Sequence, residues 1–140
     1  MAWGDLPLLA DTSAWARVRH DPEGWQQAIS DERLVTCSVV ELELLHSARS
    51  RAAVTALLDE LSVLRHLAIT QTILDAAIAS IADLARRGAD GSHRVAPADA
   101  MIAACAAEHG CAVLHYDRHY DRLAEVLGFT SIWLAPAGSV

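Results

Sequence analysis

Four acidic residues stand where predicted strands end or predicted helices begin, each among apolar neighbours. They are Asp11, Glu43, Asp99 and Asp117. Two unscreened carboxylates about 4 Å apart repel each other by roughly 4 kcal/mol at an effective dielectric constant near 20, so several of them together require a bound cation or raised pKa values. If these four side chains converge, they form an oxygen-rich pocket for a divalent cation such as Mg²⁺.

Three of these acids also have an ordinary structural interpretation. Asp11 precedes a predicted helix, where a carboxylate interacts favourably with the helix dipole. With Ser13 two positions later, the same pair would suit a cation, because the hydroxyl can hold a water molecule or a phosphate oxygen. Asp99 lies in the first turn of a helix whose later residues are small and apolar, and a buried acid there needs a partner. Asp117, taken alone, fits an ordinary turn.

The fourth acid has a rival two residues away. Glu41 and Glu43 lie about 200° apart around a predicted helix, so they cannot both face one pocket. Ser38 and Glu41 have the spacing of a capping box, which predicts that Glu41 reaches back to the backbone of the first turn. The neighbours of Glu43 three or four residues away predict a partly buried face, and we therefore favour Glu43 as the functional residue.

The charge of the chain excludes one way of binding nucleic acid. The net charge is −7, and all 11 basic residues are arginine. A broad basic face that neutralises phosphates is therefore excluded, and a phosphate-bearing substrate must be held at a few points. Arginine forks bind phosphate in bidentate fashion, although each arginine cluster also fits a solvated helix face. The clusters are Arg49 with Arg51, Arg86 with Arg87, His93 with Arg94, and Arg118 with Arg122.

Length and cysteine usage indicate a single cytoplasmic domain. A chain of 140 residues can bury a full hydrophobic core without disulfides. The three cysteines are odd in number and lie in apolar stretches, which is typical of free thiols in a reducing compartment. The N-terminus does not fit a secretory signal, and the longest apolar run, residues 101–107, is too short to cross a bilayer. We therefore expect no membrane association.

Strand and helix patterns alternate along the chain, which predicts a three-layer α/β/α sandwich with a mostly parallel sheet. In such folds ligands bind at the carboxyl ends of the strands, where Asp11 and Asp117 fall. A loop at residues 88–94 with two glycines and a basic tip precedes Pro97. We expect strands near residues 6–10, 34–37, 111–115 and 131–134, and helices near residues 12–18, 22–29, 38–48, 51–64, 70–87, 97–110 and 119–126.

Four motifs with these acids follow one another over nearly the whole chain. They are Asp-Thr-Ser-Ala-Trp at 11–15, Glu-Leu-Leu-His-Ser-Ala-Arg-Ser at 43–50, Pro-Ala-Asp-Ala-Met-Ile-Ala-Ala at 97–104, and Leu-His-Tyr-Asp at 114–117. In this order they resemble the motifs of PIN-domain ribonucleases, and in particular of VapC toxins from VapBC toxin–antitoxin modules. The resemblance implies a single PIN domain over residues 1–140.

The resemblance also implies a metal site. Mg²⁺ or Mn²⁺ would be held by Asp11, Asp99 and Asp117, with Glu43 completing the catalytic set. One position departs from the family pattern: many relatives have a second aspartate two residues after the one that matches Asp117, and here His119 stands there. Imidazole is a poor ligand for Mg²⁺ and suits Mn²⁺ better, so the metal preference and the role of this histidine stay open.

The implied activity is metal-dependent hydrolysis of phosphodiester bonds in a structured RNA, a tRNA or an rRNA loop. The cation would neutralise charge on the phosphate oxygens, and Glu43 would orient or deprotonate the attacking water. Implied partners are a cognate VapB antitoxin and a second toxin copy in a homodimer. A phosphate-accepting receiver domain is disfavoured because the chain has no lysine. The alternative is a metal-free, PIN-like interaction module with a decayed site. Candidate substrate-binding residues are Ser13, Arg94, Arg118 and His119.

Overall fold

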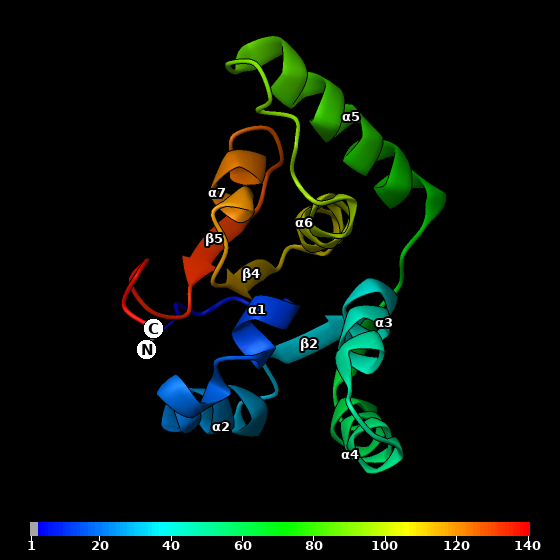
Figure 1. The fold of residues 1–140 in the computed structure, drawn as a ribbon, viewed down its shortest axis with the longest axis vertical. Helices are drawn as coiled ribbons and strands as arrows, with labels where there is room; N and C mark the ends of the chain where they lie inside the picture. Colours follow the sequence, from blue (N-terminus) through cyan, green and yellow to red (C-terminus); the bar gives the residue numbers. More distant parts are fainter. Residues whose placement is uncertain (1–2) are drawn as a thin grey trace.

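A five-stranded parallel sheet lies at the centre of the computed structural model, which describes residues 3–140 (Figure 1). The strand order is β3-β2-β1-β4-β5, so the first strand occupies the middle of the sheet. Leu9 of β1 pairs with Val35 on one side and with Val113 on the other. The strands are β1 (Leu8–Ala10), β2 (Leu34–Cys37), β3 (Arg65–Leu67), β4 (Ala112–His115) and β5 (Thr130–Trp133).

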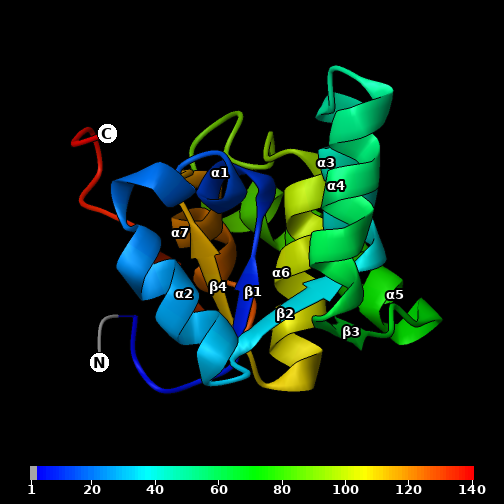
Figure 2. The same ribbon diagram turned by 90° about the horizontal axis from the view of Figure 1, so that it is seen from below.

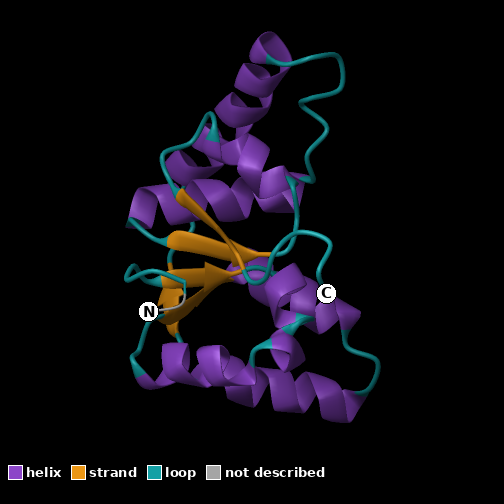
Figure 3. Cartoon of the chain, turned by 90° about the vertical axis from the view of Figure 1, so that its left-hand side faces the viewer, coloured by secondary structure: helices purple, strands orange, loops and turns teal. Residues whose placement is uncertain are grey.

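Helices cover both faces of this sheet (Figure 3). Successive strand residues point to opposite faces, so Leu8 and Ala10 pack into one hydrophobic core while Leu9 packs into the other. Trp25 and Leu61 belong to the first core, and the apolar side of α6 belongs to the second. The helical elements are α1 (Thr12–Trp15), the short 3₁₀ helix η1 (Val18–His20), α2 (Pro22–Ser30), α3 (Ser38–Ser47), α4 (Arg51–Ser62), α5 (Gln71–Arg87), α6 (Pro97–His109) and α7 (His119–Ala124).

The predicted three-layer fold is confirmed, and the local signals explain several element ends. Thr70 caps α5 by accepting a hydrogen bond from the backbone N–H of Ile73 at 3.3 Å. Pro97 begins α6, and Gly110 ends it in the left-handed conformation at φ 69°. The helix α6 is buried through most of its length, as its small apolar residues predicted. Within residues 3–140, no helix is both long and apolar enough to span a membrane.

Two local predictions are wrong. The strand β3 was not expected, because Arg65 and His66 are exposed at the sheet edge and only Leu67 points into the core. Glu41 does not form a capping box, since Cys37 precedes the first turn of α3 and makes no side-chain capping bond. Instead, a Glu41 carboxylate oxygen lies 2.7 Å from Nε2 of His66, a contact with the unpredicted strand.

The topology places the beginnings of several helices together. Figure 2 shows β1 and β4 side by side, with α1 following the end of β1. The N–H of Asp11 donates to the carbonyl of Leu114 at 3.0 Å, which continues the β1–β4 pairing to the carboxyl edge of the sheet. The helices α3 and α6 contact each other beside that edge. Residues far apart in sequence therefore meet there.

Candidate active site

A cleft of about 850 Å³ opens at the carboxyl edge of the sheet, and all four predicted acids line it. Asp11 comes from the end of β1, Glu43 from α3, Asp99 from the first turn of α6, and Asp117 from the turn after β4. The walls are completed mainly by α1, α3 and α4. Further lining residues include Ser13, Trp15, Trp25, Leu44, Ser47 and Glu60.

Asp11 is buried and held by its own helix. Its Oδ1 accepts hydrogen bonds from the Ser13 hydroxyl at 2.6 Å and from the N–H of Ala14 at 3.2 Å, so Asp11 also caps α1. The Ser13 hydroxyl in turn accepts from the N–H of Tyr116 at 2.8 Å. Because the single hydroxyl proton of Ser13 is donated to Asp11, this side chain fixes the carboxylate and ties α1 to the end of β4.

Asp99 is 7% exposed and is contacted by two neighbouring residues of α7. The hydroxyl of Tyr120 donates to its Oδ1 at 3.1 Å, and Nδ1 of His119 lies 3.0 Å from its Oδ2. Tyr120 was not among the predicted site residues, because a buried aromatic residue reads as core. The available signal was its position three residues after Asp117, at the second residue of α7.

Asp117 is positioned by a chain of hydrogen bonds behind it. Its N–H donates to Nδ1 of buried His115 at 3.1 Å, so the proton of the neutral ring must lie on Nε2. Nε2 lies 2.7 Å from the Ser131 hydroxyl, which donates to Asp121 at 2.9 Å. Asp117 Oδ1 also accepts from the N–H of His119 at 3.0 Å. The turn that carries Asp117 is therefore tied to β5.

The structure distinguishes the two glutamates on α3. Glu43 lines the cleft, whereas Glu41 does not line it and contacts His66. Among the residues that the structure describes, Oε1 of Glu43 is a buried oxygen with no hydrogen-bond partner. A buried polar atom without a partner is unfavourable, so the acceptor capacity of this oxygen is unused among the described residues.

Of the four predicted substrate-binding residues, the structure brings two into contact with the acids. Ser13 contacts Asp11, and His119 contacts Asp99. Arg94 and Arg118 are exposed and do not line the cleft. A basic residue that the sequence did not single out, Arg17, lies over the ring of Tyr116 at 4.4 Å from its centroid.

Burial makes the charged forms of these acids unfavourable without a cation. It raises the pKa of Asp11 to about 7, partly offset by the hydrogen bond from Ser13. Burial also raises the pKa of Asp99, and its hydrogen bond with His119 lowers that pKa by a smaller amount. The pKa of Glu43 is raised by burial and then by the charge of Asp99. The geometry and the raised pKa values together fit a site that binds a divalent cation.

We expect Ser131→Ala to lower the free energy of unfolding by about 1–3 kcal/mol, because it leaves the buried Nε2–H of His115 without an acceptor. Urea unfolding at pH 7 measures the change. Ser30→Ala, at an exposed position at the end of α2, is the control and should change stability by less than about 0.5 kcal/mol. Equal effects of the two substitutions would show that the hydrogen-bond chain behind Asp117 contributes nothing.

Comparison with known proteins places this arrangement in a family. Residues 8–126 match the PIN domain family, a range that includes all four acids. The chain belongs to the PIN-domain family. This PIN domain is 35% identical over 138 residues to Ribonuclease VapC18 of Mycobacterium tuberculosis, covering 96% of this chain and 100% of the relative. It is also 35% identical over 140 residues to Ribonuclease VapC51 of the same organism, covering 96% of this chain and 98% of the relative.

The fold of this PIN domain also matches solved structures. The crystal structure of DNA-bound VapBC from Salmonella typhimurium aligns with a TM-score of 0.71 and 21% sequence identity, over 94% of this chain and 100% of that one. At this level of identity the likeness shows the shared fold. The sequence-based resemblance to PIN domains is thus confirmed, by the family match and by relatives that span nearly the whole chain.

Proposed function

We propose that this PIN domain is a metal-dependent endoribonuclease and the toxin of a two-protein toxin–antitoxin module. The observation that carries the proposal is the convergence of Asp11, Glu43, Asp99 and Asp117 on one cleft, although they come from four separate segments. Its support from outside the site is the 35% identity to two proteins named as ribonucleases. We also propose that residues 1–140 act as one domain.

Asp11, Asp99 and Asp117 would hold the cation, Mg²⁺ or Mn²⁺. Two features of the cleft fit this role: the pKa of Asp11 is raised to about 7 by burial, and Glu43 has a buried oxygen without a partner among the described residues. When bound, a divalent cation would neutralise charge on the phosphate oxygens and on the leaving oxygen. It would also remove the mutual repulsion of the carboxylates.

The protein residues would position the reactants around that charge. Ser13 holds the Asp11 carboxylate in one orientation, and Tyr120 does the same for Asp99. Glu43 lines the cleft beside the three aspartates, which makes its carboxylate the candidate general base that accepts a proton from the attacking water. No protein nucleophile is required, and direct attack by water breaks the phosphodiester bond in one displacement.

The substrate that we propose is a structured RNA, held at a few points. A net charge of −7 disfavours binding along an extended strand, and the acidic cleft itself repels phosphates until a cation is bound. Arg94 and Arg118 are exposed outside the cleft, where they can pair with phosphates on either side of the cleaved bond. The substrate class is a folded RNA with an accessible loop, such as a tRNA or an rRNA loop.

We further propose an antitoxin partner and a homodimer. The solved protein from Salmonella typhimurium with this fold is described as a VapBC complex. An antitoxin of this chain would inhibit it most directly by placing a basic side chain among the four acids, where it would compete with the cation. The copurification of this protein with the product of a neighbouring small gene, and the mass of the complex, would test both assemblies.

Cleavage of purified total RNA tests the proposed activity. The protein is incubated with Mg²⁺, Mn²⁺ or EDTA, and new RNA ends are mapped by sequencing. We expect discrete cuts that require a metal and that disappear with Asp117→Asn, a substitution that keeps the size of the side chain. An absence of cutting with either metal by folded protein would refute the ribonuclease proposal in favour of a metal-free interaction module.

A further inference from the structure

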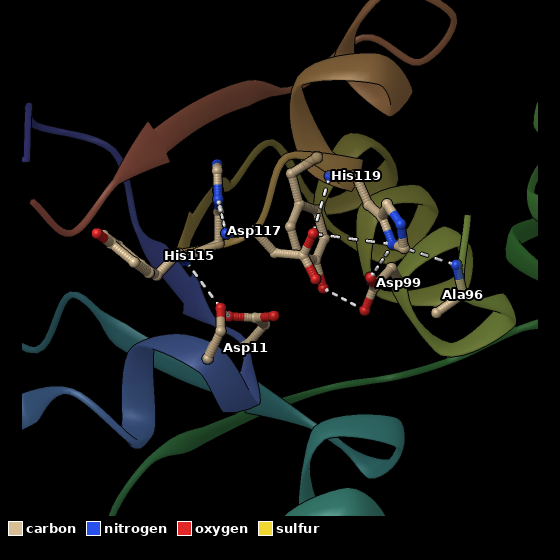
Figure 4. A network of polar contacts seen from close by, with 9 residues as sticks. Asp11, Ala96, Asp99, His115, Asp117 and His119 are labelled. Atoms are coloured by element: carbon tan, nitrogen blue, oxygen red, sulfur yellow. Dashed lines mark hydrogen bonds and ion pairs between the residues drawn. The ribbon is translucent and has the colours of Figure 1, made fainter. Parts of the chain in front are cut away.

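Three atoms converge beside the cleft, and one of them is a nitrogen. Oδ2 of Asp99, Oδ1 of Asp117 and Nδ1 of His119 come from α6, the turn after β4 and the start of α7 (Figure 4). The candidate ligand atoms of this group lie within 4.8 Å of one another. Nδ1 is 3.0 Å from the Asp99 oxygen and 3.8 Å from the Asp117 oxygen.

The hydrogen bonds around this nitrogen place its lone pair next to a carboxylate. The N–H of Ala96 points at Nδ1 from 3.3 Å, which requires a lone pair on that atom. The Asp99 carboxylate lies 3.0 Å from the same nitrogen. A nitrogen lone pair and carboxylate oxygens that face one point form a donor set for a divalent cation.

The spacing of the three atoms fits a divalent cation bound between them, which would take the lone pair that Nδ1 offers to the N–H of Ala96. Two adjacent ligands of an octahedral ion with bonds of about 2.1 Å lie about 3.0 Å apart, and two opposite ligands lie about 4.2 Å apart. The distances from Nδ1 to Asp99 and to Asp117, 3.0 and 3.8 Å, lie within this range. Small movements of the Asp117 side chain, which is 37% exposed, would complete the arrangement.

We propose that His119 is a direct ligand of the divalent cation and that it makes the site prefer a first-row transition-metal ion such as Mn²⁺ over Mg²⁺. This rests on the proposed metal-dependent function and assigns His119 to the metal in place of the RNA contact expected from the sequence. Mg²⁺ favours oxygen ligands, whereas an imidazole nitrogen adds affinity for transition-metal ions. A carboxylate at this position would offer only oxygen ligands and would remove the preference for Mn²⁺ over Mg²⁺.

Electron paramagnetic resonance of the full-length protein with Mn²⁺ tests the proposal directly. Pulsed spectra of the bound ion should show magnetic coupling to a ¹⁴N nucleus, and the pattern should change when histidine is labelled with ¹⁵N. In His119→Asp we expect bound Mn²⁺ without the nitrogen coupling. Competition titrations should show that the ratio of Mn²⁺ affinity to Mg²⁺ affinity falls about tenfold or more in this variant.

Two further variants separate a ligand from a residue that only shapes the site. His119→Ala should weaken Mn²⁺ binding by about 10- to 100-fold and also lose the coupling. His20→Asp makes the same chemical change at an exposed histidine outside the cleft and should retain both the coupling and the affinity ratio.

The possible failures are distinguishable. Tightly bound Mn²⁺ with no ¹⁴N coupling in the wild-type protein would overturn the role of His119 while leaving the proposed metal-dependent function in place. Coupling that persists in His119→Asp would also overturn it, because the nitrogen would then belong to another residue. No binding of Mn²⁺ or Mg²⁺ by the folded protein would overturn this proposal and the proposed function together.

Discussion

Asp99→Asn is expected to lower the rate of RNA cleavage by on the order of 10³-fold or more, about 4 kcal/mol in the activation free energy, while the fold stays intact. Asparagine keeps the shape of the side chain. Its carbonyl oxygen can still accept from Tyr120, and its amide can donate to Nδ1 of His119, so both observed contacts keep a partner. The substitution removes one negative charge from the cleft, and the proposed cation requires that charge.

The measurement is the initial rate of cleavage of a mapped RNA under identical metal concentrations. Asp75→Asn is the matched control, because it makes the same chemical change on the exposed surface of α5, where Asp75 accepts a hydrogen bond from Gln71. Thermal midpoints in EDTA establish that both variants fold. A rate for Asp99→Asn within tenfold of the wild type would show that Asp99 is not a ligand of the essential metal.

Asp11→Asn is expected to make the metal-free protein more stable at pH 8, by up to about 4 kcal/mol. Burial raises the pKa of Asp11 from 3.8 to about 7, and the difference between these values sets the limit on the free energy. Asparagine caps helices about as well as aspartate, and its oxygen can keep the hydrogen bonds from Ser13 and Ala14. The variant therefore removes the buried charge without removing the cap.

The sign of this effect follows from proton binding. Between pH 3.8 and about 7 the folded protein holds a proton on Asp11 that the unfolded chain releases. The stability that this proton provides is complete below pH 3.8 and is lost as the pH rises through about 7. The advantage of the variant must therefore grow with pH. With Mn²⁺ at 100 times its dissociation constant the wild type should gain about 2.7 kcal/mol, and the variant should gain much less.

Urea unfolding of both proteins in EDTA at pH 5 and pH 8, and again with Mn²⁺ at pH 8, measures these changes. Asp21→Asn is the control, since Asp21 caps α2 by accepting from Gly24 at 2.9 Å but stands outside the cleft. It must not show the gain at pH 8. An Asp11→Asn protein that is less stable than the wild type at pH 8 in EDTA would refute the unfavourable burial of this carboxylate.

The parts of the fold that the sequence predicts are those in which local pattern and tertiary packing agree. The strands β1, β2 and β4 are buried along their whole length and read as short apolar runs. The ends of α5 and α6 follow from Thr70, Pro97 and Gly110, whose backbone preferences act locally. The four acids line one cleft because parallel strands end at the same edge, which the alternating order of elements already implied.

The parts that the sequence does not predict depend on contacts between distant segments. The strand β3 is held by its pairing with β2, since two of its three side chains are exposed. Glu41 fits a capping box by spacing, but its position beside β3 offers His66 as a partner instead. Similarly, the family resemblance implies that His119 stands where many relatives have an acid, whereas the contact of its Nδ1 with Asp99 requires that α6 and α7 pack together.

The pairing of β1 with β4 determines when this protein can become active during its own synthesis. The strand β1 is made early, but one of its two neighbours in the sheet is Ala112–His115 of a chain of 140 residues. A nascent chain can hold Asp11 beside β2 and still lack Asp99 and Asp117, since the later segments that carry them have not been translated. Domains fold as units during translation. A ribosome that makes this ribonuclease is therefore not exposed to its cleaving form until the segments that carry Asp99 and Asp117 have been translated.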